Sequence, residues 1–346
     1  MALLDIKNLT LYIDTGDGTV KALEKVNLSL NEGEIRALVG ESGSGKSLMV
    51  RCIIGAIPDY WSIKADRITY KGQDLLNMSY EQRRQIMRRE IAVVFQEPTS
   101  SLDPSVTIGE QLMESIPPEF IDKGWFWEKA KQRKQIAIRL IHQVGIKDHD
   151  KYLSAYPHNI PSDVGQKIMI AMALASEPKI LICDDSTRGM ESTTKTQILR
   201  LLMKLNKTKN LAILFVSHDL LAITSVTQSI TVLYCGQTVE SAKVKSLLKR
   251  PLHPYTKALL DSAPSFQMSL PTKSPLKALE GTIPTLQHLP SGCRLGPRCP
   301  NARKECVSVP APRAIQEHIY SCHFPLHLPE KSRRKSIARP LGMQDE

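Results

Sequence analysis

The sequence has no long apolar run. Nowhere do ~18 uncharged apolar residues follow one another, the length that a membrane-spanning helix requires. The first residues alternate apolar with polar side chains and include Asp5, a pattern typical of a strand and not of a signal peptide. The sequence also lacks a visible internal repeat, which argues against a repeat array. We therefore expect a cytosolic protein that does not itself span a membrane.

The composition is that of a globular protein. Of 346 residues, 23% are charged and 42% are hydrophobic, which argues against extended disorder. At ~150 residues per domain the chain is long enough for two or three units. The net charge is +11, with basic clusters in 83–89 and 331–335. Such a charge suits nucleic acid, the anionic face of a membrane, or merely solvated helix faces and a basic tail, so charge alone leaves the partner open.

Hydrophobic patterns predict an α/β fold. Strands are predicted over 4–13, 26–30, 35–39, 68–70, 91–95, 180–183 and 211–216, and as a hairpin over 230–234 and 237–240. Helices are predicted over 80–89 and 127–144, and no strong strand pattern occurs between 97 and 163. From about Pro264 the sequence is rich in proline and typical of loops. A parallel sheet flanked by helices, with a helical insertion, is the consistent architecture.

The stretch GESGSGKS, residues 40–47, lies between a strand-like run at 35–39 and a helix-like run at 48–54. A strand, this glycine-rich sequence and a helix, in that order, form the context of a phosphate-binding loop, or P-loop. Its glycines let backbone N–H groups surround phosphate oxygens at a helix N-terminus. The predicted nucleotide-binding residues are Gly40, Ser42, Gly43, Ser44, Gly45, Lys46 and Ser47. Lys46 is expected to reach the β- and γ-phosphates and Ser47 to bind Mg²⁺, so the chain is predicted to bind a nucleoside triphosphate.

Polar residues end three further predicted strands. Asp184 follows the apolar run 180–183, where P-loop enzymes place the carboxylate that holds Mg²⁺. Asp185, the next residue, is the candidate that polarises the attacking water. Gln96 is a candidate to orient that water or to contact Mg²⁺, and His218 to contact the γ-phosphate. Gln96 or His218 alone is most simply a polar residue at a strand end, but four such sites in this order predict an ATPase.

Over residues 1–262 this order resembles that of the nucleotide-binding subunits of ABC transporters. Several stretches are similar to the peptide (dipeptide/oligopeptide) importer branch of that family: residues 40–47, 95–98 with 101–104, 156–158 and 253–256. Residues 234–240, 292–300 and 322–325 look most like the Sap group of that branch, named for sensitivity to antimicrobial peptides. The resemblance extends to about residue 327. It implies a P-loop ABC ATPase core with a helical subdomain and a small, loop-rich, cysteine-containing C-terminal extension.

The resemblance also implies cofactors, partners and location. ATP and Mg²⁺ are expected, with ATP hydrolysis coupled to translocation. A second ATPase subunit, expected to be a paralogue in a heterodimer, would bind head to tail, and the pair would dock under two transmembrane permeases that receive cargo from a periplasmic peptide-binding protein. The chain would then be a peripheral protein on the cytoplasmic face of the bacterial inner membrane. In this family an aromatic residue near the start stacks on adenine, for which Tyr12 is the nearest candidate and Ile13 the alternative, and residues 97–103 would contact the permease.

Two stretches depart from the family. The signature, normally Leu-Ser-Gly-Gly-Gln, falls at residues 160–164 and reads Ile-Pro-Ser-Asp-Val. Pro161 replaces the serine that hydrogen-bonds the partner subunit's γ-phosphate, and Asp163 places a negative charge where a glycine N–H approaches that phosphate. Asp185 stands where the family has glutamate, which displaces the carboxylate by ~1.5 Å. We expect the chain to bind MgATP and to hydrolyse it slowly; the alternative is sequence drift that costs little.

The seven cysteines fall into two classes. Cys52, Cys183 and Cys235 stand singly in apolar settings, as inert core thiols do, whereas four gather at the C-terminus. In a reducing compartment such a group favours a metal site over disulfides. The spacings lack the close pairs of structural zinc sites and suit an iron–sulfur cluster, with zinc and free thiols as alternatives. The family resemblance points to a [4Fe-4S] cluster. The four predicted ligands are Cys293, Cys299, Cys306 and Cys322.

We expect three parts in the chain: an ATPase domain over 1–262 with a helical subdomain inserted at about 97–175, a C-terminal extension over 263–330, and a basic tail over 331–346. Two other functions compete with peptide transport. A soluble ABC ATPase acting on DNA or ribosomes would suit the basic charge, but such proteins commonly carry two cassettes and this chain has one; we expect no nucleic-acid partner. A regulatory or structural subunit with little hydrolysis would suit the altered signature, and polyamine (putrescine) transport is an alternative cargo.

Overall fold

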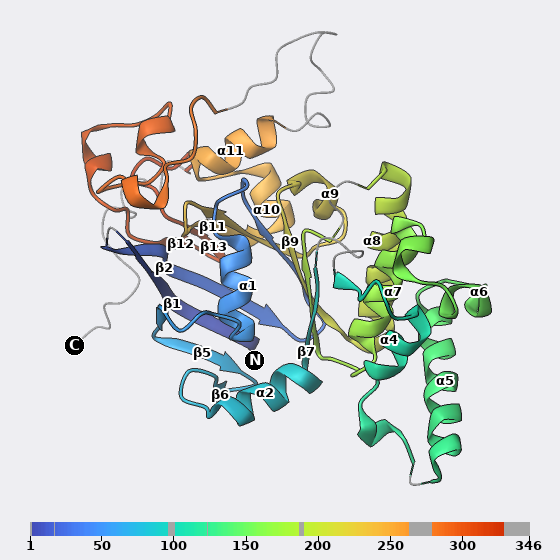
Figure 1. The fold of residues 1–346 in the computed structure, drawn as a ribbon. Coiled ribbons are helices and arrows are strands. Elements are labelled where there is room, and N and C mark those ends of the chain that lie inside the picture. Colours follow the sequence, from blue (N-terminus) through green and yellow to red (C-terminus); the bar gives the residue numbers. More distant parts are fainter. Residues whose placement is uncertain are drawn as a thin grey trace. The chain divides into compact units, whose positions relative to one another are not determined.

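The computed structural model describes residues 2–16, 18–95, 101–122, 124–186, 190–262 and 279–328. The chain divides into two compact units (Figure 1). The first unit comprises Met1–Asn31, Ile35–Leu76 and Val216–Glu346. The second comprises Glu32–Glu34 and Asn77–Phe215.

An antiparallel sheet forms one part of the first unit. It contains β1 (Ala2–Thr15), β2 (Gly18–Asn31), β4 (Trp61–Lys64), β5 (Arg67–Tyr70) and β6 (Gln73–Asp74). The strand order is β2-β1-β5-β6, and β4 also pairs with β1. Leu4 lies opposite Leu30 and Ile6 opposite Leu28, and these side chains are buried, which is why the apolar residues alternate. The strands predicted in this region are confirmed, although β2 begins well before the predicted start at Val26.

A second sheet in the first unit carries the hairpin that the sequence predicts. Strand β3 (Ile35–Val39) runs parallel to β10 (Ser229–Tyr234), and β10 turns at Cys235 and Gly236 into the antiparallel β11 (Gln237–Lys243). Both turn residues have positive φ, +48° at Cys235 and +77° at Gly236, as a tight hairpin turn requires. This part of the prediction is confirmed.

Residues 279–328, where the sequence predicts only loops, also contain regular structure. They add the hairpin β12 (Arg313–Ile315) and β13 (His318–Tyr320) to the sheet, with β13 paired to β11 (Figure 1). The buried Glu240 of β11 accepts hydrogen bonds from the backbone N–H groups of Leu252 and His253, at 2.7 and 2.9 Å, and lies 2.5 Å from His318 Nε2. Three-residue strands are too short to show an alternating pattern, so pairing with β11 decides their conformation.

The helices of the first unit are α1 (Lys46–Ile54), α9 (Leu220–Thr224), α10 (Val244–Lys249) and α11 (Pro254–Asp261), and single 3-10 turns occur at Leu286–His288, Gly296–Arg298 and Lys304–Val307. Helix α11 begins with a buried cap, since Nδ1 of His253 accepts a hydrogen bond from the N–H of Tyr255 at 3.1 Å. Burial lowers the pKa of His253 to about 4, so the ring is neutral near pH 7 and can serve as this acceptor.

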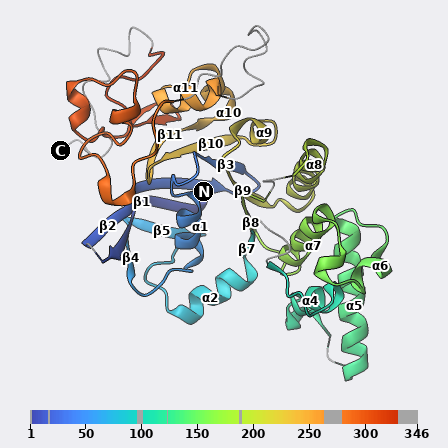
Figure 2. The same cartoon turned by 45° about the horizontal axis from the view of Figure 1, so that its top comes forward.

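The second unit combines a parallel sheet with a group of helices. Strand β7 (Ile91–Val94) runs parallel to β8 (Ile180–Asp184), and β9 (Ala212–Ser217) follows β8 in the strand order. Helix α2 (Tyr80–Arg89) contacts β7, and α8 (Ser192–Lys209) leads to β9. Helices α4 (Ile108–Glu114), α5 (Phe126–Gln143), α6 (His149–Leu153) and α7 (Ser162–Leu174) pack on one another (Figure 2). Single 3-10 turns lie at Pro118–Phe120 and Pro157–Asn159.

The structure confirms that the segment predicted as a helical insertion is helical. Helix α5 matches the predicted helix over 127–144, and residues 101–122 and 124–163 contain no strand. In the described part of the chain, no helix combines the length and the apolar character that crossing a membrane would demand.

Candidate functional site

The P-loop connects β3 to α1 and depends on three glycines. Gly43 and Gly45 have φ of +83° and +100°, a left-handed conformation that favours glycine. A Cβ on Gly40 would lie 2.1 Å from the carbonyl oxygen of Leu233, so only glycine fits there. Because Gly45 directly precedes the first turn of α1, the loop ends at a helix N-terminus, where the backbone N–H groups favour an anion.

Lys46, at the end of the P-loop, hydrogen-bonds residues at the start of the same loop. Its buried ammonium group donates to the carbonyl oxygens of Gly40 and Glu41 at 2.8 and 2.9 Å, and lies 3.4 Å from Oγ of Ser44. Ser44 is fully buried, whereas Ser42, Gly43 and Ser47 are exposed. The loop therefore offers one buried positive charge and a hydroxyl that solvent reaches, the two groups that the sequence predicts for phosphate and for Mg²⁺.

The hairpin turn between β10 and β11 supports the P-loop. The N–H of Gly236 donates to the carbonyl oxygen of Ser44 at 2.8 Å. On its other side, the carbonyl oxygen of Gly236 accepts from the N–H of Glu24 at 2.8 Å. A Cβ at Gly236 would lie 2.0 Å from the carbonyl oxygen of Ala22, so this turn passes too closely for a larger residue. The position of the P-loop thus depends on a turn that lies almost 200 residues away in sequence.

The two carboxylates that the sequence predicts lie in the second unit. Asp184 ends β8 and Asp185 begins the turn after it, and both are half-buried. Asp185 has φ of +48°, a left-handed conformation that aspartate tolerates better than most residues. Ser186, the next residue, is buried and hydrogen-bonds Cys183, which restricts the conformation of this turn. Burial raises the pKa of Cys183 to about 12. The roles of the two carboxylates toward Mg²⁺ and water stay predictions.

The remaining predicted ATP contacts are His218, Tyr12 and Gln96. His218 is exposed just after β9, where the N–H of Asp219 donates to Oγ of Ser217 at 3.0 Å. Tyr12 is half-exposed in β1, and the ammonium group of Lys64 lies 5.5 Å from the centre of its ring. Gln96 lies outside the described residues, as do residues 97–100 of the predicted permease contact at 97–103.

The signature region begins a helix abruptly. Pro161 immediately precedes α7, and Ile160 is extended, with φ of −116° and ψ of 146°. This conformation agrees with the restriction that proline places on the preceding residue. The carboxylate of Asp163 stands in the first turn of α7, where it lies 3.8 Å from the ammonium group of Lys167. The first turn of α7 therefore carries a carboxylate beside the backbone N–H groups that would bind an anion, and this negative charge opposes such binding.

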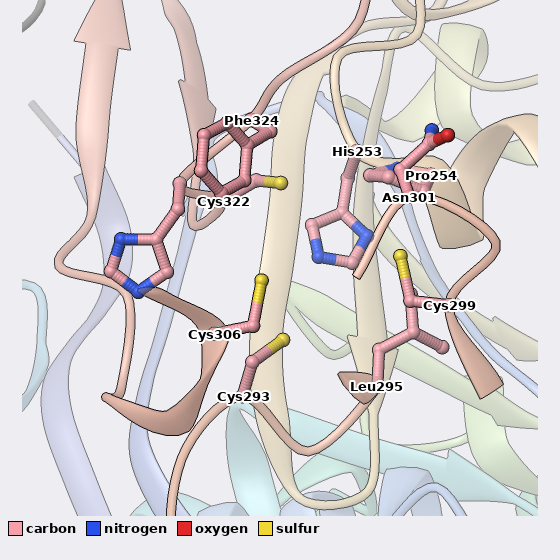
Figure 3. Close-up of a pocket in the computed structure, with 10 residues that line it drawn as sticks. His253, Pro254, Cys293, Leu295, Cys299, Asn301, Cys306, Cys322 and Phe324 are labelled. Carbon is pink, nitrogen blue, oxygen red and sulfur yellow. The ribbon is translucent and has the colours of Figure 1, made fainter. Parts of the chain in front are cut away.

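The four C-terminal cysteines line one small cavity of about 10 Å³ in the first unit (Figure 3). Burial raises the pKa of Cys293, Cys299 and Cys322, the last to about 12, and the neighbouring thiols add to each shift. The other residues that line the cavity are His253, Pro254, Leu295, Asn301, His323 and Phe324.

These thiols meet the donor chemistry of a metal site but not its geometry. The space is near the minimum that holds one water molecule. Across the described residues, no group of three or more His, Cys, Asp or Glu side chains lies close enough to hold a metal ion. The structure therefore brings the four predicted ligands to one cavity but does not support the predicted [4Fe-4S] cluster, because no three of these thiols lie close enough to hold one metal ion.

Several residues at the P-loop were not identified from the sequence. Arg298 contacts Glu41, Arg294 contacts Glu24, and Tyr255 contacts Glu41. Tyr255 lies in the stretch 253–256, and Arg294 and Arg298 lie in 292–300; both stretches resemble the family, but the sequence predicted no contact partner for these residues.

The sequence is similar to known ATP-binding proteins of peptide transport. The family model described as "ABC transporter" matches residues 23–188, and "Oligopeptide/dipeptide transporter, C-terminal region" matches 239–306. The peptide transport system ATP-binding protein SapD of Salmonella typhimurium is 48% identical over 328 residues, which cover 95% of this chain and 99% of that protein. The dipeptide transport ATP-binding protein DppD of Escherichia coli is 37% identical, covering 94% and 98%.

Among solved structures, a dimeric post-hydrolysis state of the ATP-binding cassette MJ0796, bound to ADP and Pi, is similar at a TM-score of 0.59 and 26% identity. It covers 70% of this chain and 98% of that one. The P-loop lies within the first matched region, and three of the four C-terminal cysteines lie within the second.

Proposed function

The chain belongs to the ABC transporter family of ATP-binding subunits, and we propose that it energises a peptide-type ABC transporter by binding and hydrolysing ATP. The observation that carries this proposal is the match to a peptide-transport relative over 95% of the chain, including its C-terminal region. The P-loop supports it, with left-handed glycines, a helix N-terminus and a buried lysine at the place of the phosphates. ABC ATPases couple this chemistry to transport through other subunits.

Those subunits are part of the proposal. We place the chain on the cytoplasmic face of a bacterial inner membrane, bound to two transmembrane permeases and served indirectly by a periplasmic peptide-binding protein. A second ATPase subunit, expected to be a paralogue, would complete each ATP site with its signature. Residues 97–103 would form the contact with the permease, within an ATPase domain over 1–262 that precedes a separate C-terminal extension.

Within the ATP site, each candidate has a proposed role. Ser47, Gln96 and Asp184 would hold Mg²⁺, Asp185 would polarise the attacking water, His218 would contact the γ-phosphate and Tyr12 would stack on adenine. Asp185 is one methylene shorter than the glutamate of the family, and its left-handed backbone is an additional restriction on where the carboxylate reaches. Together with Pro161 and Asp163 in the signature, this supports slow hydrolysis, and it favours a regulatory ATP-binding subunit as the second candidate function.

The four-cysteine cavity has a separate proposed role as a metal centre. Four thiols that line one cavity are a donor set for iron–sulfur or zinc. Because these thiols have raised pKa values, a metal would have to displace their protons. The bound metal would then stabilise the folded conformation of the segments that carry the cysteines. Iron–sulfur is proposed on the family resemblance, and zinc is the other outcome.

Two measurements test the function. First, MgATP is titrated into the purified full-length chain and into Lys46→Ala. Loss of the buried ammonium group should weaken binding about ten- to hundredfold, because a hydrogen bond to a charged group contributes ~1.5–3 kcal/mol. Lys204→Ala, an exposed lysine on α8, is the matched control and should bind MgATP as the wild type does.

Second, the chain is purified from solubilised membranes with its associated proteins, and the complex is placed in liposomes. Recovery of two permeases and ATP hydrolysis stimulated by peptide support the proposal. Stimulation by putrescine and not by peptides would favour polyamine transport. Recovery with nucleic acid and no permease would overturn the assignment to a transporter.

A further inference from the structure

We propose that Arg298 is a positioning residue for the P-loop, through which the C-terminal cysteine region sets the affinity of this chain for ATP. The inference rests on the proposed ATP binding and adds to it a control point outside the nucleotide site. It concerns residues of the first unit only. The contact that carries it is the ion pair between Arg298 and Glu41, the second residue of the P-loop.

This ion pair is bidentate, with two contacts between guanidinium nitrogens and carboxylate oxygens. Nη1 of Arg298 lies 2.9 Å from Oε2 of Glu41, and Nη2 lies 3.5 Å from Oε1. The arginine side chain is 8% exposed and that of the glutamate 31%. A paired guanidinium and carboxylate at this depth are screened less by water than a surface pair, and the planar fork fixes direction as well as distance. The pair therefore holds the P-loop in place as well as neutralising a carboxylate beside a phosphate site.

Contacts outside the P-loop fix the position of the Arg298 guanidinium group. Its Nε donates to the carbonyl oxygen of Glu280 at 3.1 Å, and Nη1 also donates to the hydroxyl of Tyr234 at 3.3 Å. The centre of the Tyr234 ring lies 5.8 Å from the guanidinium carbon, within cation–π range. Tyr234 belongs to β10 and packs on Tyr255, whose ring centre lies 4.6 Å away. Arg298 is thus a rigid support.

Arg294 makes a second, parallel connection. It is 5% exposed, and its Nη2 lies 2.7 Å from Oε2 of Glu24. Its Nη1 donates to the carbonyl oxygen of Cys235. The next residue, Gly236, donates its N–H to the carbonyl oxygen of Ser44 in the P-loop. Two arginines of one short segment therefore support the P-loop, one directly and one through the hairpin turn.

Both arginines are chain neighbours of cysteines in the cavity, since Cys293 precedes Arg294 and Cys299 follows Arg298. Backbone hydrogen bonds make the segment between them compact. The N–H of Gly296 donates to the carbonyl oxygen of Cys293 at 2.8 Å, and the N–H of Arg298 donates to the carbonyl oxygen of Leu295 at 2.8 Å. The N–H of Cys293 donates to Cys306 at 2.9 Å. The side chains of Cys293 and Cys299 line the same cavity (Figure 3), so a group that held these two thiols together would also limit how far the two neighbouring arginines move.

The direction of the effect follows from charge. Without Arg298, the Glu41 carboxylate is left uncompensated beside the place of the triphosphate, where like charges repel, and the loop loses a support. Arg298→Met should weaken MgATP binding about tenfold, a difference of ~1.4 kcal/mol. Arg298→Lys keeps the charge but not the fork, so it should recover part of the loss.

The test is a double-mutant cycle on the full-length chain, with MgATP titrated into wild type, Arg298→Met, Glu41→Gln and the double variant. In the Glu41→Gln background there is no carboxylate for Arg298 to neutralise, so adding Arg298→Met should then change affinity less than threefold, about 0.6 kcal/mol. Lys304→Met is the control in the same region, because Lys304 is exposed and does not line the cysteine cavity, so this change should leave affinity unchanged.

The outcomes separate this inference from the proposed function. If wild type does not bind MgATP, the proposed function fails. If wild type binds and Arg298→Met binds equally well, or if Arg298→Met loses as much affinity in the Glu41→Gln background as in wild type, the positioning role is wrong. Partial recovery with Arg298→Lys, and a smaller loss in the Glu41→Gln background, support it.

Discussion

The hydroxyl oxygen of Tyr255 accepts a hydrogen bond from the backbone N–H of Glu41 at 2.8 Å. Tyr255 is fully buried and is the second residue of α11, which begins at Pro254 and is capped by His253. Glu41 is therefore held at its backbone by one residue and at its carboxylate by Arg298. The P-loop of this chain has supports from two segments that lie more than 200 residues away in sequence.

Removal of the Tyr255 hydroxyl should cost stability. Tyr255→Phe keeps the ring packed on Tyr234 but leaves the N–H of Glu41 without its acceptor, a loss of about 1–2 kcal/mol in the free energy of unfolding. Urea unfolding monitored by circular dichroism measures it. Tyr80→Phe is the control, because that ring is 82% exposed and should change stability little. Equal stability of the two variants would contradict the role of this hydrogen bond.

The pH dependence of stability should include a contribution from Glu24. Burial by itself would raise the pKa of this carboxyl group, but the hydrogen bond from Lys21 and the charge of Arg294 outweigh it and hold the pKa below 4.5. Between the folded and the ordinary pKa, the unfolded state binds more protons, so stability falls as the pH is lowered below about 4.5. Glu24→Gln should be less stable at pH 7 and show a shallower loss on acidification. Glu32→Gln, an exposed control, should follow the wild type; a Glu24→Gln curve parallel to wild type would contradict the prediction.

The four-cysteine cavity predicts a bound metal in protein purified without oxygen. Visible absorption together with iron and zinc analysis decides between the two centres, and Cys306→Ser should lower the metal content because it removes one of four donors. Cys52→Ser is the control, since that cysteine lies in α1. A colourless protein with zinc and no iron would reject the cluster, and a metal-free protein with four reactive thiols would reject both centres.

Asp185 predicts low turnover. In the proposed two-subunit ATPase, Asp185→Glu should raise the rate of ATP hydrolysis about tenfold or more with little effect on MgATP affinity, because the proposed general base would then be better placed and such a base contributes ~10²–10⁴-fold. Pro161→Ser with Asp163→Gly should raise the rate at the other site of the pair. Asp163→Asn alone, which keeps Pro161, serves as the control for charge. A wild-type rate equal to those of the repaired variants would show that these departures cost nothing.

Local pattern was sufficient for much of the fold. The strand at 35–39, the P-loop and α1 follow one another as predicted, because apolar runs and glycines report directly on burial and on backbone conformation. Helix α5 was predicted within one residue at each end, since its apolar positions repeat with helical spacing. The hairpin β12–β13 was not predicted, because its strands have three residues each and depend on pairing with β11.

By itself the sequence determined the P-loop as a strand, a glycine-rich turn and a helix, and it predicted which residues would meet phosphate and Mg²⁺ and which four cysteines lie together, since these depend on residue type and spacing. Only the tertiary structure decided what holds the P-loop. Arg298 and Glu41 are 257 positions apart, and no local pattern links them. The same holds for the cysteines: their spacing suggested a cluster, but only the fold decided that the four thiols line one small cavity. Contacts between distant segments depend on how the chain folds back on itself, and that information lies in the packing rather than in any one stretch.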